Sequence, residues 1–256
     1  MSKINPIIVI PSRLGATRLP NKPLRLINGL PMIVQVINRC LKSKINQILV
    51  AVAEQEIIDA IEIHFKENPR VKAVLTSPLL NTGSDRINQA LLSFDKDKTY
   101  NYVINVQGDL PTISASAIDD CLSLLIKDNV DISTLVAPMQ EQKDVINPNI
   151  VKAVLSFKNN NDTEAQAIYF SRSPVPSGAT TYYHHIGIYG YKRDILEKFT
   201  SLNQGYIEKL EKLEQLRALE NNISIYAKIS NEIPLGVDVE EDLKKAEIIL
   251  NSREDL

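Results

Sequence analysis

The chain has 256 residues, of which 44% are hydrophobic and 23% charged, so it is long enough for one large α/β domain of ordinary globular composition. A formal net charge of -2 gives no electrostatic reason to expect nucleic acid or an anionic membrane as a partner. No apolar run approaches the roughly 20 residues that span a bilayer, and residues 1–6 lack the apolar region of a signal peptide. Cys40 and Cys121 stand outside any CxxC motif, which predicts reduced thiols in a cytoplasmic protein.

The first half of the chain alternates between strand-like runs and helical patterns. Short runs rich in β-branched residues predict strands, and apolar residues at three- and four-residue spacing predict the helices between them. The expected strands are 7–10, 47–52, 71–76 and 102–106, and the expected helices are 31–42, 54–66 and 84–94. This alternation predicts an α/β fold with a mostly parallel, twisted sheet flanked by helices.

The middle of the chain has a different pattern. Strand-like runs at 132–137, 151–157, 167–170 and 185–191 are joined by polar and proline-containing connections. We expect residues 131–205 to form a small mixed or antiparallel insertion within a single domain of residues 1–256. One helix is predicted over 205–220, with a leucine stripe that suits a core or a subunit contact, before a strand near 223–228 and a last helix from Glu240.

The segment 11–23, PSRLGATRLPNKP, is called the basic loop here and follows the first predicted strand. It places Arg13, Arg18 and Lys22 around Gly15, and prolines stiffen its exit. Three cations on a loop at a strand end suit a polyanion such as a triphosphate. A solvated basic loop is the alternative.

Two aspartates follow other predicted apolar runs. Asp109 ends the sequence NVQGD, in which Gly108 is expected to let the backbone turn sharply, and Asp238 follows PLGV. Mg²⁺ is held by one or two protein carboxylates together with phosphates and water, so this pair predicts a metal site beside the triphosphate. Alternatively, Asp109 forms a turn and Asp238 caps the last helix.

Other reaction types lack their motifs. The sequence contains neither GxxxxGK[ST] nor GxGxxG, and its three histidines, His64, His184 and His185, are not spaced as zinc ligands. No serine or cysteine lies in a nucleophile-elbow context. The residues therefore favour positioning of a phosphorylated ligand over covalent catalysis or hydride transfer.

Over nearly its whole length the chain resembles the 3-deoxy-manno-octulosonate (KDO) cytidylyltransferases, or CMP-KDO synthetases. The resemblance rests, in chain order, on IPSRLGATRLPNKPL, NGLPMI, TGSDRI, NVQGD, NPNIVKAVL, YFSRSPVP, HIGIYGY, EKLEKLEQLRALEN and GVDVEEDL. The first motif is shared by sugar nucleotidylyltransferases broadly, whereas YFSRS, HIGIYGY and LEQLR are specific to the KDO enzymes. The resemblance implies a nucleotide-diphospho-sugar transferase-like fold. It also implies transfer of CMP from CTP to KDO, with release of pyrophosphate, for lipopolysaccharide synthesis.

The resemblance also implies roles for residues at the matching positions. Arg13, Arg18 and Lys22 would hold the CTP phosphates, and Asp109 and Asp238 would bind Mg²⁺, with Arg13, Lys22, Asp109 and Asp238 as the catalytic set. The nucleotide side would also be lined by Pro11, Thr82, Gly83, Ser84 and Gln107. The sugar acid would face Arg172, His185, Tyr189, Glu214 and Gln215.

The residues themselves leave some of these roles open. The planar fork of Arg172 suits the substrate carboxylate, although a surface arginine would look the same in sequence. His185 and Tyr189 are four apart on one predicted strand and share a face, which fits a common pocket or a buried hydrogen-bonded pair.

Five positions, Leu30, Ala53, Leu79, Leu80 and Leu110, depart from the family pattern, and Ala53 removes a carboxylate near the nucleotide. These departures leave open a cytidylyltransferase for another sugar acid, such as a modified KDO or a sialic acid, and a non-catalytic nucleotide-binding homologue. A homodimer is also implied by the resemblance, with its contact in the middle region and the leucine-striped helix.

Overall fold

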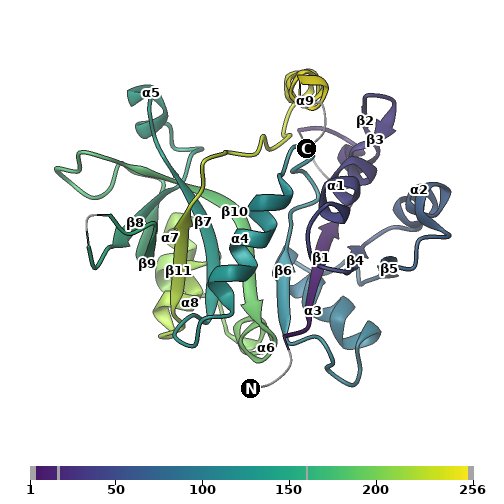
Figure 1. Cartoon of the computed structure of the whole chain (residues 1–256), viewed down its shortest axis with the longest axis horizontal. Helices are drawn as coiled ribbons and strands as arrows, with labels where there is room; N and C mark the ends of the chain where they lie inside the picture. The colour runs from purple at the N-terminus through teal and green to yellow at the C-terminus, as the bar shows by residue number, and fades with distance from the viewer. Residues whose placement is uncertain (1–3, 16–17, 160, 253–256) are drawn as a thin grey trace. The chain divides into compact units, whose positions relative to one another are not determined.

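A computed structural model describes residues 4–15, 18–159 and 161–252 of the protein (Figure 1). It divides into two compact units, each described by itself: one runs to Asp119 and resumes at Pro234, and the other is Asp120–Ile233. Residues 131–205, expected as a small insertion, lie within the second unit. Over the described ranges, no helix combines the length and the apolar character needed to cross a membrane.

The first unit contains the predicted parallel sheet. Its strands are β1 (Pro6–Ser12), β4 (Gln47–Val52), β5 (Val71–Leu75) and β6 (Tyr102–Asn105), in the order β5-β4-β1-β6. All three pairings are parallel, and Ile8 pairs with Ile48 on one side and with Ile104 on the other. The central residues of β1 and β4 are buried, because a sheet covered on both faces requires continuous apolar strands. The predicted α/β fold is therefore confirmed.

Helices cover this sheet on its two faces (Figure 1). The helices α1 (Met32–Leu41) and α2 (Gln55–Phe65) carry the chain from β1 to β4 and then to β5. The helix α3 (Gly83–Phe94) returns the chain past β1 to β6. Because crossovers of parallel strands are right-handed, this reversal of direction takes α3 to the opposite face. The carboxyl ends of β1 and β6 therefore flank the point where ligands bind in such sheets.

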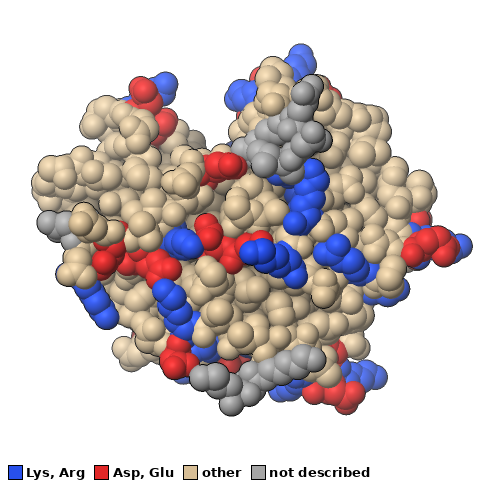
Figure 2. Space-filling model, viewed as in Figure 1, with Lys and Arg blue, Asp and Glu red and all other residues tan. Residues whose placement is uncertain are grey.

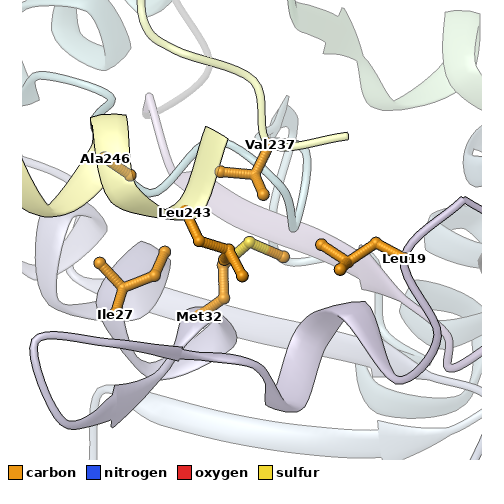
Figure 3. Close-up of a cluster of buried hydrophobic side chains, with 6 residues drawn as sticks. All are labelled: Leu19, Ile27, Met32, Val237, Leu243 and Ala246. Carbon is orange, nitrogen blue, oxygen red and sulfur yellow. The ribbon is translucent and has the colours of Figure 1, made fainter. Parts of the chain in front are cut away.

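The last segment of the chain returns to the first unit and packs beside the basic loop. The helix α9 (Glu240–Ser252) covers the short hairpin of β2 (Leu26–Ile27) and β3 (Leu30–Pro31), which follows the 3-10 turn η1 (Lys22–Leu24). Six buried side chains converge between these elements (Figure 3): Leu19, Ile27, Met32, Val237, Leu243 and Ala246. Leu19 belongs to the basic loop and Val237 precedes Asp238, so one apolar cluster holds both segments in place.

The second unit has a mixed sheet. Its strands are β7 (Ile132–Pro138), β8 (Lys152–Ser156), β9 (Glu164–Ser171), β10 (Tyr183–Lys192) and β11 (Ile225–Ile229), in the order β10-β7-β11-β9-β8. The β11–β7 pair is parallel and the others are antiparallel, including a further short pairing of β10 with β8. The mixed character expected for this region is confirmed.

Four helices that accompany this sheet were not predicted as such. They are α5 (Gln142–Val145), α6 (Arg193–Ser201), α7 (Tyr206–Glu211) and α8 (Leu216–Glu220). A fifth, α4 (Ala115–Leu125), connects the two units along the chain. On the face that Figure 2 draws, basic and acidic side chains are interspersed and neither sign forms a broad patch.

The prediction of one helix over 205–220 is wrong, because the chain folds back between α7 and α8. Lys212 ends α7 in the left-handed conformation, with φ 55° and ψ 46°. The carboxylate of Glu220 accepts the N–H groups of Ile207 and Glu208, at 3.0 and 3.2 Å. In one continuous helix Glu220 would stand about 20 Å along the axis from Ile207. The expected leucine stripe is split accordingly, with Leu216 buried and Leu210 65% exposed.

Candidate active site

A pocket of about 320 Å³ opens in the first unit at the carboxyl ends of β1 and β6. Its walls come from the basic loop after β1, the first turn of α3 and the turn after β6. Of the residues predicted for the nucleotide and the metal, the walls include Pro11, Arg13, Lys22, Thr82, Gly83, Gln107 and Asp109. Arg18, Ser84 and Asp238 are not in the walls, and Ala16 and Thr17 of the basic-loop motif lie outside the described residues.

Lys22 joins the two predicted metal ligands. Its Nζ lies 2.8 Å from Asp109 Oδ2 and 2.9 Å from Asp238 Oδ1. Burial alone would lower the pKa of Lys22, but Asp109 and, more weakly, Asp238 outweigh it, so the pKa is raised. The lysine is therefore charged at neutral pH and holds two carboxylates from distant parts of the sequence around one nitrogen.

Asp238 directs its carboxylate to the basic loop instead of capping α9. Its Oδ2 accepts Arg18 Nη2 at 3.1 Å, in addition to the contact of its Oδ1 with Lys22. The amides of Asp238 and Val239 donate instead to the carboxylate of Asp242, at 3.1 and 3.3 Å. Asp242 thus satisfies two amides at the start of this helix, and Asp238 is left for the site.

The turn after β6 is set by a close approach between neighbouring strand ends. A Cβ added to Gly108 would lie 2.8 Å from the carbonyl oxygen of Pro11, which is too close for any side chain. Among the described residues the glycines with a positive φ are Gly29 and Gly178, so Gly108 is not one of them. Gly108 is therefore required by contact with β1 and not by the sharp turn that the sequence predicted.

The second unit brings three of the predicted sugar-binding residues together. The rings of His185 and Tyr189 lie 5.3 Å apart, and burial, with Tyr191 and then Glu214 nearby, raises the pKa of Tyr189 well above 10. A bulge in β10 shifts the register between Ile186 and Tyr189, but His185 and Tyr189 still oppose alternate residues of β7. Both side chains therefore stay on one face, as predicted.

Arg172 is engaged with backbone carbonyls. Its Nε donates to Glu211 O at 3.1 Å and its Nη1 to Pro148 O at 3.0 Å, while the Glu211 carboxylate accepts the Arg172 amide. Arg172 thereby ties the end of β9 to the end of α7. Gln215 is buried beside the start of α8.

His185 is predicted to make the protein sensitive to acid. Burial lowers its pKa from 6.5 to about 3, with a smaller effect from His184. Thr134 Oγ1 lies 3.0 Å from His185 Nε2 and 2.8 Å from the carbonyl of Ile188. The hydroxyl therefore donates to that carbonyl and accepts a hydrogen bond from the Nε2–H group. The neutral ring fits this arrangement, and protonation would charge a buried group.

Between pH 3 and 6.5 the folded protein therefore binds fewer protons at His185 than the unfolded chain does. As the pH falls through this range, the free energy of unfolding should decrease by up to about 1.4 kcal/mol per pH unit. Urea unfolding at several pH values measures this slope. It should flatten in His185→Gln and persist in His64→Gln, whose side chain is exposed. Equal slopes in wild type and His185→Gln would contradict the assignment.

The sequence pattern of the cytidylyltransferase family matches residues 7–228. The 3-deoxy-manno-octulosonate cytidylyltransferase of Paramagnetospirillum magneticum is 43% identical over 98% of this chain and 100% of its own length. The enzyme of the same name from Rhodospirillum rubrum is 46% identical over 96% of this chain and 95% of its own. The chain belongs to the 3-deoxy-manno-octulosonate cytidylyltransferase family. The resemblance stated from the motifs is confirmed.

Comparison with solved structures agrees with this family assignment. A structure of CMP:2-keto-3-deoxy-manno-octonic acid synthetase complexed with CTP matches 98% of this chain and all of that chain. Its TM-score is 0.85 and its sequence identity is 30%. A cytidylyltransferase from Leptospira borgpetersenii matches with a TM-score of 0.64 at 16% identity, which shows the shared fold.

Arg86 and Ser12 are among the pocket residues of the cytidylyltransferase that were not predicted. Arg86 is 2% exposed and donates from Nη1 to Thr76 Oγ1 at 2.6 Å. It belongs to the motif TGSDRI and lies one helical turn after Thr82, so helical spacing could have placed it at the pocket. Ser12 is buried in the pocket wall, and its Oγ has no hydrogen-bond partner among the described residues. Together they add a cation and a polar hydroxyl to the predicted set.

Asp109 and Asp238 fit a divalent cation as its protein ligands. Both carboxylates already converge on one cationic nitrogen. No group of three or more His, Cys, Asp and Glu in the described part of the chain could hold a metal, so these two would act without a third such side chain. That is the ligand set Mg²⁺ takes when substrate phosphates and water supply the remaining positions.

Proposed function

We propose that this cytidylyltransferase transfers CMP from CTP to KDO, giving CMP-KDO and pyrophosphate for lipopolysaccharide synthesis. The observation that carries the proposal is Lys22, which gathers Asp109 and Asp238 at a pocket walled by Arg13 and Arg86. Such a site neutralises a triphosphate and offers two carboxylates to a metal. The names of the two relatives supply the nucleotide class and the sugar acid.

Arg13, Arg18 and Lys22 would hold the triphosphate of CTP. Donors fixed by the fold stabilise the charge that develops when the α-phosphoryl is transferred, without rearranging during the reaction. The start of α3 at the pocket wall adds the positive end of the helix dipole. The nucleotide would be lined by Pro11, Thr82, Gly83, Ser84 and Gln107, of which Ser84 is buried next to Gly83 and is not itself in the walls.

Asp109 and Asp238 would hold Mg²⁺, the cofactor that we propose. When bound, the ion would neutralise charge on the transferred phosphoryl group and on the leaving pyrophosphate. Lys22 keeps the two carboxylates ordered before nucleotide arrives. Because phosphoryl transfer depends on alignment and charge neutralisation, the site requires no protein nucleophile.

We place the sugar acid in the second unit, where Arg172 would stand at the border of its site. The other residues that would face it are His185, Tyr189, Glu214 and Gln215. The clustering of His185, Tyr189 and Glu214 supports this placement. The neutral His185 would serve as a hydrogen-bonding group and not as a cation. We further propose a cytoplasmic homodimer in which residues 1–256 work as one nucleotidyltransferase domain and residues 131–205 contribute to the sugar site and the dimer contact.

Release of pyrophosphate tests the proposal. The protein with CTP and Mg²⁺ should release pyrophosphate when KDO is added, and should release far less with a sialic acid. Faster release with the sialic acid would show that the substrate is a sugar acid other than KDO. Binding of CTP without release for any sugar acid would instead identify a non-catalytic nucleotide-binding homologue.

A further inference from the structure

Glu54 ties the first half of the basic loop to the sheet. It lies two residues beyond β4 and immediately before α2. Its Oε2 accepts the backbone N–H of Leu14 at 2.9 Å. Beside this contact, the amide of Ala53 donates to the carbonyl of Ser12 at 3.2 Å, which extends the β1–β4 pairing by one residue. Leu14 is thus held at a fixed distance from the end of β4.

Glu54 also lies among the pocket's cations. Arg13, the neighbour of Leu14, and Arg86 both contribute to the pocket wall. Burial lowers the pKa of Arg86, attraction to Glu54 opposes this effect, and repulsion from Arg13 adds to it. Two guanidinium groups on one wall repel each other, and the carboxylate of Glu54 reduces the cost of holding them there.

The two halves of the basic loop are fastened by different means. The second half is held by Leu19 in the apolar cluster and by the ion pairs of Arg18 and Lys22. The hydrogen bond to Glu54 performs this task for the first half, where Arg13 stands. A charge-assisted hydrogen bond to a backbone amide is suited to holding this half of the loop. Such a bond fixes the backbone directly beside Arg13 and leaves the Arg13 guanidinium free for a ligand.

We propose that Glu54 is a positioning residue for CTP binding: by holding the Leu14 amide, it sets Arg13 at the place where the triphosphate is bound. The inference rests on the proposed function only in the identity of the nucleotide. Position 53, where the family pattern has a carboxylate, is Ala53, and in this chain a carboxylate of the next residue reaches the loop.

Three variants separate the hydrogen bond from the charge. Glu54→Ala removes both, and Glu54→Gln keeps an oxygen that can accept the Leu14 N–H but loses the charge. Glu56→Ala removes a nearby exposed charge that makes no hydrogen bond or ion pair with the described residues of the basic loop. CTP affinity is measured by calorimetry with Mg²⁺ and without sugar. Exchange of the Leu14 amide is followed by NMR in the protein without nucleotide.

We expect Glu54→Ala to bind CTP about tenfold more weakly, the effect of one charge-assisted hydrogen bond. Glu54→Gln should stay within about threefold of wild type, because its amide oxygen keeps the contact, and Glu56→Ala should match wild type. Exchange at Leu14 should accelerate in Glu54→Ala alone. The Michaelis constant for KDO should not change in any of the three.

Other outcomes would overturn the inference. An anion near a triphosphate repels it, so a carboxylate that acted by charge alone would give tighter CTP binding in both Glu54→Ala and Glu54→Gln. Equal weakening in both variants, or unchanged Leu14 exchange in Glu54→Ala, would also contradict it. If the wild-type protein binds no CTP, the proposed function fails, and the exchange measurement still decides whether Glu54 holds the loop.

Discussion

Asp109→Asn is expected to reduce turnover by about a thousandfold or more while leaving the fold intact. The neutral amide keeps the size of the side chain but is a poor ligand for Mg²⁺ and a weaker partner for Lys22. The backbone carbonyl of Asp109 accepts the amide of Val237 at 3.0 Å, and this link between the two carboxylate segments does not depend on the side chain. Lys22 also retains Asp238, so this lysine keeps a carboxylate partner.

Pyrophosphate release and thermal unfolding test this expectation together. Asp97→Asn is the matched control, since Asp97 is exposed and precedes the amino end of β6, away from the pocket walls. The control should have wild-type turnover, and all three proteins should unfold at similar temperatures. Turnover of Asp109→Asn close to that of wild type would remove Asp109 from the metal site.

The spacing of apolar residues predicted the first unit well, because each of its strands and helices is encoded by its own residues. Each buried strand reads as a continuous apolar run and each helix as a stripe, so the four strands and three helices were placed within two residues or so of their ends. The helix over 205–220 failed for the opposite reason. Its interruption at Lys212 depends on contacts between residues at the two ends of the segment, Glu208 with Arg217 and Glu220 with Ile207. A helical pattern carries no sign of such contacts.

In the candidate site, too, residues that belong to a local pattern were predicted, and residues placed by distant contacts were not. A loop with three cations at a strand end was readable, and so was Asp109 at the next strand end along the edge. The sequence could not show that Asp238 faces Arg18 and Lys22 instead of capping α9, because both cations lie far away in sequence. Glu54 was missed because its side chain accepts a backbone amide, that of Leu14, 40 residues away, and no sequence motif marks such a contact.

Glu208→Gln is expected to lower the free energy of unfolding by about 3 kcal/mol, because the buried Arg217 guanidinium loses the nearer of its two carboxylate partners, Glu208 at 2.6 Å as against Glu214 at 3.8 Å. Arg217 donates from Nε and Nη2 to the two carboxylate oxygens of Glu208, at 2.8 and 2.6 Å, and the side chains are 4% and 5% exposed. The guanidinium also lies 5.0 Å from the centre of the Phe199 ring, so it cannot move out to water without disturbing that packing. Urea unfolding followed by circular dichroism measures the loss.

The pair of Lys245 with Asp242, in which the lysine is exposed, provides the control. Lys245→Gln removes one charge from a pair at 3.0 Å in which the lysine is 62% exposed, and it should cost less than about 1 kcal/mol. A second variant tests the cause. Glu208→Gln combined with Arg217→Met removes both charges of the buried pair and should recover part of the stability lost by Glu208→Gln alone, because the buried guanidinium is then gone. If Arg217→Met costs as much stability in the Glu208→Gln background as it does alone, the loss in Glu208→Gln arises from packing and not from the broken ion pair.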